Sequence, residues 1–131
     1  MDSITIIMPV TVKAKLTDKL RAQLVGECTA VIEQMDLELK QLEIDMQREI
    51  ERLPQQERQI RNFFGNEAGK RQARREDALR RKDTLEKLAP GAEIIRGNSE
   101  RQVTLKVGDN IRDAMGVEIL TEDDKIIAIR S

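Results

Sequence analysis

Apolar side chains recur every seven residues through the first half of the chain, and this repeat limits the available folds more than any other feature. A second apolar row, three residues after the first, completes the spacing of a coiled-coil seam. Eight of the nine seam positions are apolar, Glu49 being the exception, and only Gly26 within the segment disfavours a helix. The seam is Val25, Cys28, Ile32, Met35, Leu39, Leu42, Met46, Glu49 and Leu53. The segment therefore predicts one long helix with an apolar stripe.

A second helix is expected to follow the first. Thr17 is suited to cap the start of the first helix, and the second stretch ends at about Ala89, before Pro90-Gly91. A reversal at Leu53-Pro54 divides residues 17–89 into two arms of similar length, and Pro is suited to the first turn of a helix. A reversal at Gly65-Asn66 would leave unequal arms that cannot both return to one point. We therefore place the reversal near Leu53-Pro54.

The charges of the two arms complement each other. Residues 17–53 carry nine acidic and five basic side chains, a net charge of −4, whereas residues 54–89 carry six acidic and ten basic ones, a net charge of +4. This pattern favours an antiparallel pair of arms over association of like arms. The second arm has few large apolar residues between Glu67 and Asp83. That gap predicts either a loose middle or a second chain that covers the seam of the first arm.

Both ends of the chain change to the two-residue alternation that is typical of strands. Residues 3–16 predict one strand, bent or broken at Pro9, and turns are expected at Asn98-Ser99 and Asp123-Asp124. The C-terminal strands are expected at residues 93–97, 102–107, 117–121 and 125–130, with a short helix at 111–115. The predicted fold class is α+β: a long antiparallel two-helix coiled-coil hairpin, residues 17–89, is inserted into a small β head with a barrel-like sheet, formed by residues 1–16 and 90–131.

The composition argues against an enzyme. The 131 residues include no His, which is the commonest general base and metal ligand. The single Cys, Cys28, excludes an intramolecular disulfide and a thiolate-rich zinc site. No phosphate loop, nucleophile elbow or dinucleotide fingerprint occurs. We expect no catalytic residues, no cofactor and no metal. The apolar run that starts at Ile4 is interrupted by Thr5 and Pro9, which fits neither a signal peptide nor a membrane span, so a cytoplasmic location is expected.

A basic cluster on the second arm is the strongest candidate for nucleic-acid contact, because clustered cations displace phosphate counterions. The alternative is that these residues solvate a helix and pair with the acidic first arm, which we favour, since the net charge of the chain is −1 and aromatics are only 2% of it. The cluster comprises Lys70, Arg71, Arg74, Arg75, Arg80, Arg81 and Lys82.

Phe63 and Phe64 are the only aromatic residues. They are candidate contacts for a protein partner, or they pack across the hairpin against Leu42 and Met46. Adjacent residues point about 100° apart on a helix, so one ring can pack while the other stays partly exposed.

The assembled pattern resembles the YlqD family of small bacterial proteins. The resemblance rests on the opening strand that leads into Leu16-Thr17-Asp18-Lys19, on the end of the hairpin at Leu88-Ala89-Pro90-Gly91-Ala92-Glu93, and on a tail motif. The tail motif is Val107-Gly108-Asp109-Asn110, then Glu118-Ile119, then residues 124–130. Phe63-Phe64-Gly65-Asn66 does not belong to that pattern. The resemblance implies a bacterial cytoplasmic protein with no established activity, and gene neighbourhoods in the family hint at RNA.

Taken together, these features predict a non-enzymatic interaction or scaffold protein. Its partner would be another protein or a second copy bound through the hairpin. The alternative is an RNA- or ribosome-associated protein that uses the basic second arm. Nucleic acid is the less favoured partner, and no membrane association is expected.

Overall fold

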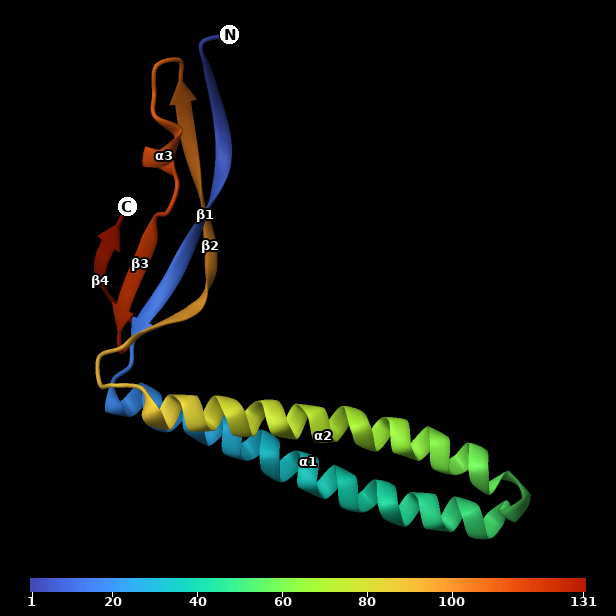
Figure 1. Ribbon diagram of the computed structural model, residues 1–131. Helices are drawn as coiled ribbons and strands as arrows, with labels where there is room; N and C mark the ends of the chain where they lie inside the picture. Colours follow the sequence, from blue (N-terminus) through green and yellow to red (C-terminus); the bar gives the residue numbers. More distant parts are fainter. The chain divides into compact units, whose positions relative to one another are not determined.

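The computed structural model describes residues 1–131, and Figure 1 shows two long helices and a small sheet. The chain divides into two compact units. One is the β head, Met1–Arg21 together with Leu88–Ser131, and the other is the helical hairpin, Ala22–Lys87. The elements are β1 (Ser3–Lys15), α1 (Asp18–Arg52), the 3₁₀ turn η1 (Pro54–Gln56), α2 (Glu57–Lys87), β2 (Glu93–Lys106), α3 (Ile111–Ala114), β3 (Glu118–Glu122) and β4 (Lys125–Arg130).

The β head is a four-stranded sheet with the order β2-β1-β3-β4. β1 runs antiparallel to β2 and parallel to β3, and β3 and β4 form an antiparallel hairpin. The N-terminal strand thus lies at the centre of the sheet, between strands that come from the last third of the chain. The predicted α+β class, with a sheet made by both termini and two long helices between them, is confirmed.

The sheet does not close into the barrel-like form that the sequence predicted. β2 and β4 are both edge strands and do not pair with each other, since four strands are too few to enclose a filled barrel. Side chains connect the two edges instead. Arg130 on β4 donates to Glu93 on β2 at 3.2 Å and to Glu118 on β3 at 2.9 Å, and Lys13 on β1 lies 2.8 Å from Glu118.

This ion network shifts the pKa values of Glu93, Glu118 and Arg130. The hydrogen bond from Arg130 lowers the pKa of Glu93, and the hydrogen bond from Lys13 is the main cause of the lowered pKa of Glu118. The pKa of Arg130 is raised, chiefly by its hydrogen bond to Glu93. The charged form of each group is therefore the favoured one in the folded protein.

β2 is one strand of 14 residues, whereas the sequence predicted two strands separated by a turn at Asn98-Ser99. The turn does not form because β1 offers a pairing partner over the whole length, with Thr11 opposite Asn98 and Val10 opposite Ser99. The irregularity is instead a bulge that leaves Arg96 without an opposite residue.

β1 also continues through Pro9 without a break. The amide of Thr11 donates to Val117 and so points away from β2. Pro9, two residues earlier, has its nitrogen on the same side of the strand. The missing N–H of Pro9 therefore costs no hydrogen bond to β2.

The core of the β head is small. It consists of aliphatic side chains from β1, β3 and the segment around α3, together with Leu16, which follows β1. The buried residues are Val10, Ala14, Leu16, Ala114, Val117 and Leu120.

The helices begin and end at local signals. The Thr17 hydroxyl accepts from the amide of Leu20 at 3.1 Å, which makes Thr17 the predicted cap of α1. Leu53 leaves the helix, and the turn that starts at Pro54 leads into α2. No helix is long and apolar enough to span a membrane.

Candidate interaction surfaces of the helical hairpin

The hairpin has a narrow buried seam. Its buried side chains are Leu24, Cys28 and Met35 from α1 and Ile60, Ala78 and Leu85 from α2. The other large apolar residues of the predicted seam are only partly buried. They are Val25, Ile32, Leu39, Leu42, Met46 and Leu53.

Ion pairs close the middle of the hairpin. Arg71 Nε lies 3.2 Å from Glu38 Oε1, and Arg75 Nε lies 2.7 Å from Asp36 Oδ1. Met35 is only 2% exposed at this level, although α2 supplies no large apolar side chain there. Long arginine side chains can cover apolar surface with their alkyl stems while the guanidinium reaches a carboxylate. The arms therefore meet through a polar layer at the centre.

Four members of the basic cluster have acidic partners within the hairpin. Arg71 and Arg75 pair with α1 as described, Lys70 pairs with Glu67 at 3.2 Å, and Arg80 pairs with Asp77. The hydrogen bond from Arg71 lowers the pKa of Glu67, and the same bond raises the pKa of Arg71. Arg74, Arg81 and Lys82 have no ion pair. The structure thus brings only part of the cluster to the surface as free positive charge.

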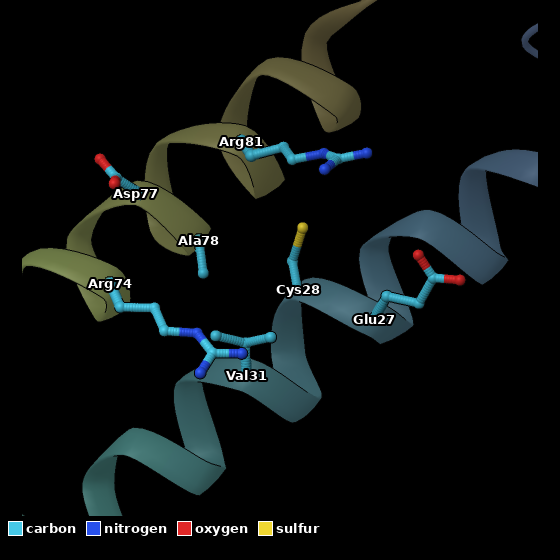
Figure 2. Close-up of a pocket in the computed structure, with 7 residues that line it drawn as sticks. All are labelled: Glu27, Cys28, Val31, Arg74, Asp77, Ala78 and Arg81. Atoms are coloured by element: carbon cyan, nitrogen blue, oxygen red, sulfur yellow. The ribbon is translucent and has the colours of Figure 1, made fainter. Parts of the chain in front are cut away.

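Two of the unpaired arginines border a groove between the helices (Figure 2). Its volume is about 300 Å³, and it exists because the small Ala78 faces Cys28 and Val31. Figure 2 shows the Cys28 thiol directed toward α2, with Arg74 and Arg81 at the mouth of the groove. The thiol is buried, with 6% of its residue exposed. The groove thus has an apolar floor and a rim that also carries Glu27 and Asp77.

The two phenylalanines have different environments. Their rings meet edge to face, with centroids 5.3 Å apart and planes at 89°. Phe64 is half-buried and lines a second groove of about 230 Å³ with Leu42 and Met46, whereas Phe63 is 60% exposed. Phe64 thus lies beside apolar residues of α1, whereas the ring of Phe63 is exposed to solvent.

A further pair of exposed side chains was missed by the sequence reasoning. Leu37 and Ile44 on α1 are 63% and 48% exposed. Each follows a buried seam residue, Cys28 or Met35, by nine residues, which corresponds to about half a turn around the helix axis. Leu37 and Ile44 are seven residues apart, and this spacing could have indicated a second apolar position on the helix. The longer apolar row on the opposite face was the stronger pattern and determined the prediction.

The structure contains no group of three or more Cys, Asp or Glu side chains placed to hold a metal ion. The grooves described above are lined by apolar side chains and charged residues without a nucleophile–base pair.

The family model described as YlqD protein matches residues 4–130. The chain belongs to the YlqD family. The resemblance that the termini and tail motif indicated is therefore confirmed, and it covers nearly the whole chain. Members of this family are uncharacterised, so membership assigns no activity.

A solved structure has the same fold. It is the crystal structure of a protein of unknown function from Synechococcus sp. WH 8102, with a TM-score of 0.88 and 24% sequence identity over 100% of both chains. At this identity the similarity shows the fold alone. No curated protein matches the sequence.

Proposed function

We propose that this YlqD-family member is a non-enzymatic, cytoplasmic interaction protein whose coiled-coil hairpin binds a protein partner at the Phe63 end. The exposure of Phe63 is the observation that carries the proposal. A large ring that is 60% exposed in a chain with only two aromatics is available as an anchor for a partner.

The surroundings of Phe63 support this role. Its ring packs edge to face against Phe64, an arrangement that favours this orientation of the exposed ring. The half-exposed apolar residues beside Phe64, Leu39 and Met46 among them, extend the surface along α1. An aromatic anchor next to an apolar groove is suited to the apolar face of a partner helix.

RNA or ribosome association is the second candidate, and the unpaired arginines favour it. Arg74 and Arg81 are seven residues apart, so their Cα atoms are separated by about 10 Å along one side of α2. Free guanidinium groups on one side of a helix can contact the phosphates of a nucleic-acid strand. Reversal of these two charges leaves the Arg71–Glu38 and Arg75–Asp36 pairs intact.

Affinity capture from native bacterial lysate distinguishes the two functions. The tagged proteins are the wild type, Phe63→Glu and Arg74→Glu/Arg81→Glu, and each is used with and without nuclease. The proposal predicts a protein partner that survives nuclease and is lost with Phe63→Glu. The matched control is Leu79→Glu, an exposed apolar position elsewhere on α2, which should retain the partner.

The opposite result identifies RNA. If ribosomal proteins and RNA are captured, and are lost after nuclease treatment or after charge reversal at Arg74 and Arg81, the RNA proposal replaces the protein-partner proposal. The affinity of such a complex should fall steeply with salt concentration, whereas an apolar contact at Phe63 should be nearly insensitive to salt.

A further inference from the structure

The hydroxyl of Thr17 connects two distant parts of the β head. It accepts from the amide of Leu20 at 3.1 Å, which caps α1, and it donates to Oδ1 of the Asp123 carboxylate at 2.7 Å. Asp123 lies 106 residues further along the chain, in the turn between β3 and β4. Because a hydroxyl has a single proton, donation to Asp123 leaves its lone pairs for the Leu20 amide. The cap of α1 and the β3–β4 turn therefore share one oxygen atom.

The β3–β4 turn gives the Asp123 carboxylate a defined position. Glu122 pairs with Lys125, so Asp123 and Asp124 form the entire loop. Their φ values are 47° and 70°, and positive φ at both loop positions is typical of a type I′ turn between antiparallel strands. They are the only residues other than glycine with a positive φ. A loop this short moves only together with its strands, so the position of the carboxylate follows the β3–β4 hairpin.

The charge of Asp123 strengthens the cap. A carboxylate accepts a stronger hydrogen bond than a neutral group, and it polarises the hydroxyl, which then accepts more strongly from the Leu20 amide. A negative charge beside the first turn of α1 also opposes the positive end of the helix dipole. Both effects act within the first turn of the helix, and the surface position of the contact keeps them modest.

The start of α1 also bonds the segment that follows α2. The amide of Leu16 donates to the carbonyl of Ala92 at 2.8 Å, and the Arg21 guanidinium donates to the carbonyl of Leu88 at 2.7 Å. The Asp123 contact adds the β3–β4 hairpin as a third segment. The place where the chain leaves the sheet for the first helix is thus held by segments that are far apart in sequence.

We infer that the Thr17–Asp123 hydrogen bond is a clasp through which the β3–β4 hairpin controls the opening of the first turn of α1. While the bond is made, the Thr17 hydroxyl keeps the orientation that caps the helix. When the β3–β4 turn moves away, the hydroxyl rotates freely and the first turn opens more often. The coupling is reciprocal, so opening of the first turn of α1 also weakens the β3–β4 turn. The clasp is independent of the partner site proposed at Phe63.

Hydrogen exchange of single amides provides the test. Exchange is measured by NMR on the full-length chain for wild type, Asp123→Gly and Asp124→Gly. Glycine accepts a positive φ, so both variants keep the turn, but only Asp123→Gly removes the carboxylate that bonds Thr17. The Leu20 amide should exchange about three- to tenfold faster in Asp123→Gly, which corresponds to the loss of one hydrogen bond. Asp124→Gly is the matched control and should leave this rate unchanged.

Removal of the hydroxyl completes the test. In a Thr17→Ala background, Asp123→Gly should cause no further acceleration at Leu20, because the group through which Asp123 acts is absent. In a Thr17→Ser background, which keeps a hydroxyl, Asp123→Gly should again accelerate exchange. The amide of Met35, in the middle of α1, should exchange at the wild-type rate in every variant, because the clasp acts on the first turn alone.

Three results would overturn the inference. They are equal Leu20 exchange in wild type and Asp123→Gly, the same acceleration with and without the Thr17 hydroxyl, and an acceleration at Met35 as large as that at Leu20. None of these measurements depends on a partner at Phe63, so the two proposals fail separately.

Discussion

Leu24 is the most enclosed large side chain of the hairpin, with 1% of its surface exposed, and only a few residues share its environment. The hairpin is 66 residues long, from Ala22 to Lys87, yet its buried seam consists of six side chains. The stability of the hairpin therefore depends on few residues, and individual surface ion pairs add little to it.

Truncation of one seam residue should accordingly have a large effect. Leu24→Ala is expected to lower the free energy of unfolding by about 2–5 kcal/mol, the sum of lost burial and the cavity left behind. Chemical denaturation monitored by circular dichroism measures the change. Leu79→Ala, at a position that is 39% exposed, should change the free energy by no more than about 0.5 kcal/mol. Equal effects of the two substitutions would contradict the assigned seam.

The ion network of the β head should make stability depend on pH. The pKa values of Glu93 and Glu118 are lowered in the folded state, so their contribution is present above the ordinary glutamate pKa of about 4.3 and is lost as the pH falls through the lowered values. The melting temperature of the wild type should therefore fall on acidification below about pH 4.

Arg130→Gln isolates the cause of this dependence. The variant removes the main hydrogen bond to Glu93, so the pKa of Glu93 should return toward its ordinary value, while Lys13 continues to lower the pKa of Glu118. Carboxyl NMR titration of both residues measures the two changes. Identical titration of Glu93 in wild type and variant would show that Arg130 does not control it.

Among the secondary-structure elements, the helices followed local signals more closely than the strands did. The Thr17 cap and the heptad repeat of α1 are local features, since they depend on residues within a few turns. The Asn98-Ser99 pair is also a local turn signal, but pairing with β1 overrides it and keeps β2 extended. Strand structure depends on a partner that is distant in sequence, and local propensity is a weak guide to it.

Two glycines show how backbone conformation decides the effect of a substitution. Gly26 lies within α1, and a Cβ there would meet no atom within 4 Å. Gly26→Ala should therefore stabilise the protein by about 0.5–1 kcal/mol through its higher helix propensity. The increase is measured as a higher denaturation midpoint.

Gly116 is the matched contrast. A Cβ there also has free space, but the backbone has a φ of +74°, which disfavours any L side chain. Gly116→Ala should consequently destabilise the protein by about 1 kcal/mol. A stabilising effect would mean that the segment after α3 does not need this left-handed conformation.

For the molecule as a whole, the sheet depends on strands that lie at opposite ends of the chain. β1 pairs with β2 and β3, so its neighbours on both sides come from residues after 92. The hairpin sequence is inserted between strands of the same sheet, and the β head cannot form before the whole chain is available.

Deletion of residues 92–131 tests this dependence. The remaining chain, residues 1–91, keeps β1 without a pairing partner, and an unpaired apolar strand promotes aggregation. We expect this fragment to be insoluble, whereas a fragment of residues 17–91, which lacks β1, should be soluble. A soluble and helical fragment 1–91 would contradict the inserted arrangement, and the soluble fraction after expression is the measurement.

The sequence by itself determined the fold class, the two long helices with a sheet from both termini, and the family, because periodicity, capping residues and the tail motif are contained in short segments. Only the tertiary structure decided the open order of the sheet, the continuity of β2, which acidic residues of α1 pair with Arg71 and Arg75, and the exposure of Phe63, Leu37 and Ile44. These features depend on which distant residues meet in space. A heptad pattern shows that a helix has an apolar face, but the partner helix decides how much of that face is covered.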